Sequence, residues 1–417
     1  MVLKKFSAAK LGEKRDKVLG SYIHRVAYYF AYEESAMIQN YLNSNTNYPL
    51  LQGIQTNLYK CFLPQSWYLA KPEGSSAFIT QEGIYNDPYG QQLRTACYSR
   101  LKYLFFFHNE KELFDILHTR RFDIHIFASI TRDIEFDLIS DLFHPSTIDN
   151  SYNHDGCGHI KGIKDENNNW NIWGHKDRIV KINKKLLSLC ASIYDEEGTS
   201  SHQARLPNIH SIQIQNVLRK ISILKEKVVD IQENYFFTQM WNETGATKNN
   251  IIKRTTTFSK SINSWIISGP HIYVGNPFYK TANAVCEKHH DYSVLDLNIM
   301  PLNYLSRTNY VVACESDKYK KNIPTVPWGG KVCDFTRLAF RGMLSPKGER
   351  TLITALLPEG AAHINGVLTI AFRSIQDLIA VASFSHSIVA DFFIKTTGRS
   401  NLHRTWENFP LINYSKE

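Results

Sequence analysis

Long apolar runs are absent from this sequence, which argues against a protein that crosses a membrane by helices. No stretch approaches the roughly eighteen consecutive apolar residues that a membrane span needs. Residues 1–17 begin with basic side chains but have no apolar core behind them, so neither a secretory signal nor an anchor is expected. We therefore expect a soluble, cytoplasmic protein with no membrane partner.

Cysteine is scarce and unpaired in the sequence. The chain has seven cysteines and no CxxC pair, which excludes a disulfide ladder and the common paired-cysteine zinc patterns. His154, Cys157, His159 and His175 lie within one predicted loop, but their spacing matches no standard zinc pattern. Ordinary loop histidines are the favoured interpretation, and no metal is expected.

Three motifs that bind phosphate or cut DNA are also missing. Gly156 and Gly158 begin a GxG, but the next glycine is Gly162, so the GxGxxG dinucleotide motif fails. The GxxxxGK[ST] phosphate loop does not occur. No Asp or Glu has a lysine two positions later, which argues against a nuclease of the PD-(D/E)xK type.

The sequence does have an excess of positive charge. Lys and Arg exceed Asp and Glu by 48 − 39 = 9, and 12% of the residues are aromatic. A basic protein favours polyanionic partners, and aromatic rings can stack on unpaired bases. Nucleic acid is therefore the favoured class of partner.

Hydrophobic periodicity predicts an α+β fold. Helix and strand patterns alternate through the first part of the chain, as in an α/β sheet: helix over 19–42 and 57–70, strand over 77–80, helix over 91–100, strand over 103–107. Residues 144–175 read as a loop, residues 178–194 and 206–235 as helices, and residues 255–313 as short β-type runs.

One short pattern suggests catalysis. Residues 272–274 form an apolar run, predicted as a small strand, that leads through Gly275 into Asn276, Pro277, Phe278 and Tyr279. DNA methyltransferases that modify an amino group place Asn-Pro-Pro-aromatic at such a strand end, where the Asn holds the amine and the ring stacks on the flipped base. Here Phe278 replaces the second proline, and the same residues would serve as a turn after a strand.

Longer segments resemble the large adenine-specific DNA methyltransferases of type II restriction-modification and phage-defence systems. Residues 56–94 resemble the helix-strand-helix segment after the catalytic loop of that family, and residues 105–127 resemble its next strand. Further similar segments come from the family's recognition half: 143–149 (FHPSTID), 204–210 (ARLPNIH), 265–281 (WIISGPHIYVGNPFYKT), 305–310 (LSRTNY) and 391–399 (DFFIKTTGR). The resemblance covers nearly the whole chain and lies in the order of its segments.

The resemblance implies the carboxy-terminal half of such an enzyme. Residues 1–127 would complete an incomplete Rossmann-like methyltransferase sheet, residues 128–250 would form a helical and irregular insertion, and residues 251–417 would form a mixed α/β target-recognition domain. The S-adenosylmethionine motif and the catalytic loop would precede residue 19, and neither occurs. A truncated or split gene product, inactive alone, is therefore expected. The same placement favours the interpretation of Asn276 to Tyr279 as a turn over that of a catalytic loop.

The implied reaction is transfer of a methyl group from S-adenosylmethionine to an adenine extruded from double-stranded DNA. This chain would supply the DNA contacts. Arg and Lys residues in turn-rich segments beside aromatic residues are the candidates: Arg254, Lys280, Arg307, Arg337, Arg341, Lys395, Arg399 and Arg404.

Three functions stay open at this point. The chain can be one half of an enzyme that needs a separately encoded amino-terminal methyltransferase half, a standalone non-catalytic DNA-binding specificity subunit, or an inert gene remnant. An upstream reading frame that ends in Asn-Pro-Pro-aromatic would favour the first.

Overall fold

The structure is a computed structural model that describes residues 8–130, 133–288, 290–345 and 348–411. It confirms a mixed α+β fold with several separate sheets. The chain divides into two compact units: unit 1 is Met1–Ser188 with Ser200–Arg205, and unit 2 is Leu189–Thr199 with Leu206–Glu417. The three-part division expected from the sequence stays a prediction.

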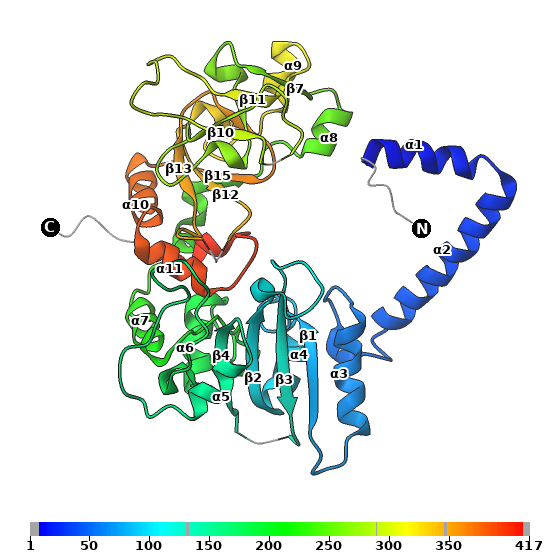
Figure 1. The fold of residues 1–417 in the computed structure, drawn as a ribbon. Coiled ribbons are helices and arrows are strands. Elements are labelled where there is room, and N and C mark those ends of the chain that lie inside the picture. Colours follow the sequence, from blue (N-terminus) through cyan, green and yellow to red (C-terminus); the bar gives the residue numbers. More distant parts are fainter. Residues whose placement is uncertain (1–7, 131–132, 289, 346–347, 412–417) are drawn as a thin grey trace. The chain divides into compact units, whose positions relative to one another are not determined.

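Unit 1 begins with helices and continues into a mixed sheet (Figure 1). Its helices and strands are α1 (Ala8–Leu19), α2 (Tyr22–Asn43), α3 (Leu58–Leu69), β1 (Ser76–Gln81), α4 (Gln91–Tyr98), β2 (Leu101–His108), β3 (Arg121–Phe127), β4 (Glu135–Leu142), α5 (Ser146–Tyr152) and β5 (Val180–Asn183), and α6 (Lys184–Tyr194) leads from unit 1 into unit 2.

The sheet of unit 1 has the strand order β1-β3-β2-β4-β5. Strand β3 runs antiparallel to both β1 and β2, and β2 runs parallel to β4. Strands β1, β2 and β4 therefore point the same way, and α4 connects β1 to β2 across the position that β3 fills. A helix between two strands of one direction is the α/β connection that the alternating pattern predicted.

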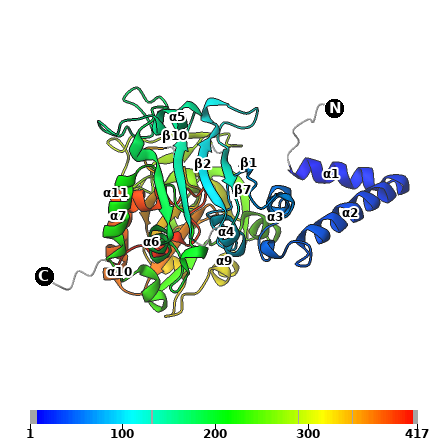
Figure 2. The same cartoon turned by 90° about the horizontal axis from the view of Figure 1, so that it is seen from below.

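The side chains of β3 alternate between the two faces of the sheet. Those on each face pack against other side chains of unit 1. Phe122 belongs to a buried aromatic cluster with Phe105 and Phe107. On the opposite face, the Phe127 ring lies 5.2 Å from the Trp67 ring of α3. Both views show α3 beside β1 (Figures 1 and 2).

A buried histidine lies on the same face of β3 as Phe127. The ring nitrogens of His125 lie 2.8 Å from the Thr80 hydroxyl and 2.8 Å from the Tyr85 hydroxyl. Burial lowers the pKa of His125 to about 3, so the ring is neutral at pH 7.

Strand β1 lies at the edge of the sheet of unit 1, with α3 beside it. Among the described residues β1 pairs with β3 and with no other strand, so the hydrogen-bonding groups of its outer edge have no strand partner. The β1 sequence Ser-Ala-Phe-Ile-Thr-Gln contains no charge and no proline, the residues that usually protect an exposed edge. None of the α2 side chains, all of which the structure describes, is buried.

Unit 2 contains smaller sheets and helices (Figure 1). Its main elements are α7 (Ile212–Ser222), β6 (Tyr235–Thr238), α8 (Glu243–Lys248), β7 (Ile252–Phe258), β8 (Ile266–Ile267), β9 (Lys280–Ala282), β10 (Tyr292–Val294), β11 (Arg307–Val312), α9 (Ser316–Asn322), β12 (Arg337–Arg341), β13 (Thr354–Leu357), β14 (Ala362–His363), β15 (Val367–Phe372), α10 (Ile375–Ser385) and α11 (Ile388–Thr396).

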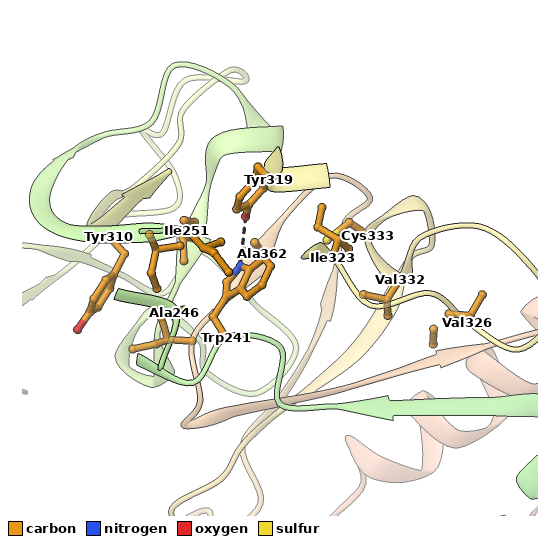
Figure 3. Close-up of a cluster of buried hydrophobic side chains, with 14 residues drawn as sticks. Trp241, Ala246, Ile251, Tyr310, Tyr319, Ile323, Val326, Val332, Cys333 and Ala362 are labelled. Atoms are coloured by element: carbon orange, nitrogen blue, oxygen red, sulfur yellow. Dashed lines mark hydrogen bonds between the residues drawn. The ribbon is translucent and has the colours of Figure 1, made fainter. Parts of the chain in front are cut away.

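The core of unit 2 surrounds an antiparallel sheet in the order β13-β12-β15-β6. Every residue of β15 is buried, as its unbroken run Val-Leu-Thr-Ile-Ala-Phe predicts. A second buried cluster brings α8, β7, α9 and β14 together around Trp241, whose indole N–H donates to the Tyr319 hydroxyl at 3.2 Å (Figure 3). This packing fixes β7 and β11 on one side of unit 2.

Several sequence predictions about local structure are wrong. The loop expected at 144–175 contains the helix α5, and of the helix expected at 206–235 only α7 is α-helical. Residues 180–183 were expected to be helical but form β5, because Val-Lys-Ile-Asn alternates buried and exposed side chains with period two. Residues 272–274 were expected to be a strand, yet Tyr273 and Asn276 close a tight turn instead.

In the described part of the chain, no single helix has the length and apolarity needed to cross a membrane; α10 and α11 meet that test only together, with a 69° bend between them.

Candidate nucleic-acid interface

Strands β7 and β11 of unit 2 form an antiparallel ribbon. The run Thr255, Thr256 and Thr257 is β-branched, which favours an extended strand. The register shifts between Thr308 and Tyr310, so a bulge interrupts β11. The DNA major groove admits an α-helix or a pair of strands; in this ribbon the middle of β11 is buried, so the exposed side chains come mainly from β7.

One row of side chains on β7 faces solvent. Lys253, Thr255 and Thr257 are spaced two residues apart and are all exposed. Lysine pairs with phosphate, and threonine hydroxyls can donate to or accept from base edges. The sequence analysis did not select these residues, although three consecutive threonines after Lys-Arg were a signal for an exposed strand.

The β9–β10 hairpin joins this ribbon through two of the predicted arginines. Arg254 donates through Nη2 to the carbonyl oxygens of Cys286 and Glu287, both at 3.1 Å. The Arg307 backbone N–H donates to Thr281 Oγ1 at 2.9 Å, and its Nη1 donates to the Ala282 carbonyl at 3.0 Å. Both guanidinium groups thus hold the hairpin to the ribbon.

Lys280 completes this group at the start of β9. Its Nζ lies 5.1 Å from the centre of the Tyr279 ring, and the Arg307 guanidinium lies 4.4 Å from the Phe258 ring. The structure therefore brings Arg254, Lys280 and Arg307 together, with Lys253 on β7 and Lys260 two residues beyond its end.

Positive charge dominates this part of the chain. Residues 252–312 contain six Lys and Arg and three Asp and Glu, so 6 − 3 = 3 positive charges are in excess. Two of the three acids hold turns. Asp291 accepts from the backbone N–H groups of Glu287 and Lys288 at 3.0 and 2.8 Å, and the bond from Lys288 is the main reason that its pKa is lowered. Asp296 accepts from the Asn298 backbone at 2.9 Å.

Four other predicted contacts lie in different surroundings. Arg341, at the end of β12, is half-buried, and burial lowers its pKa. Lys395 donates to the carbonyl oxygens of Gly348 and Glu349 and lies 3.8 Å from the Asp391 carboxylate. Arg399 donates to Thr405 Oγ1 at 3.0 Å, and Arg404 forms an ion pair with Glu407. These last three cations are engaged within the fold, as are the guanidinium groups of Arg254 and Arg307.

Arg337 does not lie on the surface. Its side chain is fully buried at the start of β12, where Nε donates to the Phe335 carbonyl at 3.2 Å and Nη2 donates to the Ala361 carbonyl. Burial also lowers its pKa. The expectation of a direct DNA contact at Arg337 is corrected accordingly: this arginine ties a loop to the core of unit 2.

The Asn-Pro-aromatic pattern forms a structural turn. Asn276 Oδ1 accepts from the Phe278 backbone N–H at 2.7 Å, so it is engaged locally. The Phe278 ring stacks on the buried Trp265 ring at 4.9 Å, and Tyr279 lies 4.8 Å from Tyr273. Gly275, with φ of 81°, permits the sharp bend. These side chains are held by the fold, as the turn interpretation expected.

The histidine-rich loop of unit 1 contains a close ring pair. The His154 and His175 rings lie 4.3 Å apart, and the Nδ1 atom of each accepts a hydrogen bond from a nearby backbone N–H. Among the described residues, no group of three His, Cys, Asp or Glu side chains has the arrangement of a metal site.

Comparisons with known proteins place few limits on the chain. No protein-family model matches it, and no curated protein matches it. Among solved structures, it is similar to the type IIG restriction endonuclease BpuSI, at 9% identity and a TM-score of 0.28. That match covers 83% of this chain and 40% of the BpuSI chain. A TM-score this low does not establish a common fold.

Proposed function

We propose that this chain is the DNA-recognition part of an adenine-specific, S-adenosylmethionine-dependent DNA methyltransferase of a restriction-modification or defence system. Its methyl-donor half would be a separate polypeptide that packs on unit 1. Two separate observations on unit 1 carry this proposal: the outer edge of β1 pairs with no described strand, and the apolar side chains of α2 are exposed. The cationic ribbon of unit 2 supports the DNA-binding part.

The exposed residues of α2 and the unpaired edge of β1 have the chemistry of a protein interface. Ile23, Phe30 and Met37 of α2 are all exposed, and Arg25 is its only Lys or Arg. On β1, Ile79 is exposed beside the unpaired strand edge. Another polypeptide can pair with such an edge and bury such a helix, and the gain scales with the apolar area removed from water.

The glycine pair Gly156 and Gly158 does not support a donor site for S-adenosylmethionine. Gly156 and Gly158 have positive φ angles, but they lie in an irregular loop after α5 and do not link a strand to a helix. A nucleotide-type ligand needs backbone N–H groups at such a strand-helix turn. We therefore assign DNA contacts to this chain and the methyl donor to its partner.

Calorimetry with S-adenosylmethionine tests the proposal. The purified chain is titrated alone and after mixing with the product of any neighbouring reading frame that ends in Asn-Pro-Pro-aromatic. We expect binding only in the mixture, followed by methylation of adenine in duplex DNA. Binding by the chain alone would overturn the assignment of the donor site to a partner.

Two alternatives give other results. A standalone specificity subunit would be folded and would bind DNA, but the neighbouring protein would not bind to it. An inert remnant would aggregate, because the open β1 edge and the apolar α2 surface would stay exposed.

A further inference from the structure

Residues 294–302, between β10 and β11 of unit 2, expose an unusual set of apolar side chains. Leu297 is 50% exposed, Ile299 is 79% exposed and Leu302 is fully exposed. Val294, at the end of β10, is also exposed. Several exposed aliphatic side chains in one short segment of a folded unit, here interspersed with the polar Asp296 and Asn298, can mark a binding surface.

This apolar segment is anchored at both ends. The Leu295 backbone N–H donates to the Tyr279 carbonyl at 3.1 Å. At the other end, the Tyr304 ring lies 6.3 Å from the Phe258 ring of β7, and Leu305 packs against the buried cluster around Trp265. The apolar side chains therefore extend from a fixed base on the β7–β11 ribbon.

The interior of the segment also has a defined path. Asp296 Oδ1 accepts from the Asn298 backbone N–H at 2.9 Å, and the Tyr304 N–H donates to the Pro301 carbonyl at 3.0 Å. These bonds close two turns in the segment that carries the exposed Leu297, Ile299 and Leu302.

The surroundings of the segment favour DNA as the occupant. Arg307 stacks on the same Phe258 ring that holds Tyr304, and Lys280 lies next to Tyr279, whose carbonyl holds Leu295. Apolar side chains flanked by cations are the pattern of proteins that insert wedges between base steps while their cations hold the phosphates. Within α2 itself Arg25 is the only Lys or Arg, although the adjoining α1 carries Lys14, Arg15 and Lys17.

We propose that Leu297, Ile299 and Leu302 form an apolar wedge that inserts between base pairs of DNA held on the β7–β11 ribbon. This inference rests on the DNA recognition proposed above and adds a physical role to it. Partial unstacking by the wedge lowers the cost of extruding a base from the duplex.

An unwinding assay tests the wedge without knowledge of the target sequence. Closed circular plasmid is relaxed by a topoisomerase in the presence of the full chain, and its linking number is then measured. Inserted side chains untwist the duplex, so we expect the wild-type chain to shift the linking number. The variant Leu297→Ser/Ile299→Ser/Leu302→Ser is expected to lose most of this shift, about fivefold, while its affinity for a mixed-sequence duplex changes by less than about threefold.

The matched control is Ile388→Ser, which alters an equally exposed aliphatic residue of unit 2 outside this segment. The control is expected to shift the linking number like the wild type. A triple variant that unwinds the plasmid normally would overturn the wedge, as would wild-type protein that binds DNA without unwinding it. Wild-type protein that binds no DNA would overturn the proposed DNA recognition together with the wedge. A triple variant that instead loses a protein partner would identify the segment as a protein-docking surface and overturn the wedge.

Discussion

The two units expose apolar surface in different chemical settings. On unit 1, the exposed residues of α2 and the open edge of β1 have few cations among them. On unit 2, the exposed residues 294–302 lie beside Arg307 and Lys280. Apolar area alone does not identify a partner, but the charge around it does: a neutral border suits another protein, and a cationic border suits a nucleic acid.

The largest effect expected within unit 2 concerns its buried cation. Arg337→Ala removes two hydrogen bonds, one of them to the buried Ala361 carbonyl, and leaves a cavity, so we expect a loss of about 3 kcal/mol in unfolding free energy. Urea unfolding measures this loss, and fluorescence anisotropy measures DNA affinity under conditions in which the variant stays folded. Unchanged stability with weakened DNA binding would restore Arg337 as a DNA contact.

On unit 1, charge placed on α2 is expected to abolish partner binding. In Ile23→Glu/Phe30→Glu/Met37→Glu, affinity for the methyl-donor half should fall about 100-fold, because three apolar side chains that the partner would bury become charged. The thermal midpoint should not change, since none of these side chains is buried.

Calorimetry and circular dichroism separate these two effects. The matched control is Ile375→Glu/Ile388→Glu, which makes the same chemical change at exposed positions of unit 2. Equal loss of partner binding in this control would show that α2 has no special role.

Charge reversal on the ribbon should have a smaller effect. Lys253→Glu/Lys260→Glu/Lys280→Glu is expected to weaken binding to a mixed-sequence duplex about tenfold or more, and the slope of affinity against salt should fall by about one for each lysine that no longer neutralises a phosphate. Fluorescence anisotropy at several salt concentrations measures both quantities. The comparison variant is Lys395→Glu/Arg404→Glu, at cations already bonded within unit 2. A larger loss of affinity in that variant would show that the DNA interface lies near Lys395 and Arg404 instead of on the ribbon.

Acid is expected to destabilise the two units by similar amounts, and by less than the substitutions above. Burial lowers the pKa of His125 in unit 1 and of His363 in unit 2 to about 3, and the nearby Arg337 charge adds to the effect at His363. The unfolded chain takes up these protons first, near pH 6.5, so this stability is present above pH 6.5 and is lost as pH falls toward 3.

For each of these buried histidines, the free energy of unfolding should fall by about 1 kcal/mol between pH 7 and pH 5.5. Urea unfolding at the two pH values measures the change, and His363→Gln should reduce it for unit 2. The exposed His24 provides the control His24→Gln, which should leave it unaltered. Greater stability at pH 5.5 than at pH 7 would contradict this account.

The sequence was informative where structure depends on neighbours along the chain. The helices expected at 57–70 and 91–100 are α3 and α4, because apolar residues with helical spacing pack directly on the adjacent strands. The strands expected at 77–80 and 103–107 are β1 and β2. Short turns connect these elements, so local pattern sufficed.

Features that depend on distant residues were not predictable in the same way. The ribbon needs β7 and β11 to pair across about fifty residues, so the exposed row on β7 had no visible partner in the sequence. Arg337 looked like a surface cation, but its burial depends on the Ala361 carbonyl, which reaches it only in the folded unit. Whether the remaining predicted cations bind DNA stays a prediction.

The length of α2 sets a lower limit on the size of the partner proposed here. A helix of 22 residues that rises about 1.5 Å per residue is about 33 Å long, roughly the diameter of a small domain. A short peptide cannot cover apolar residues distributed from Tyr22 to Tyr41 along such a rod. A partner that shields the whole helix from water therefore has to extend about as far as α2 itself.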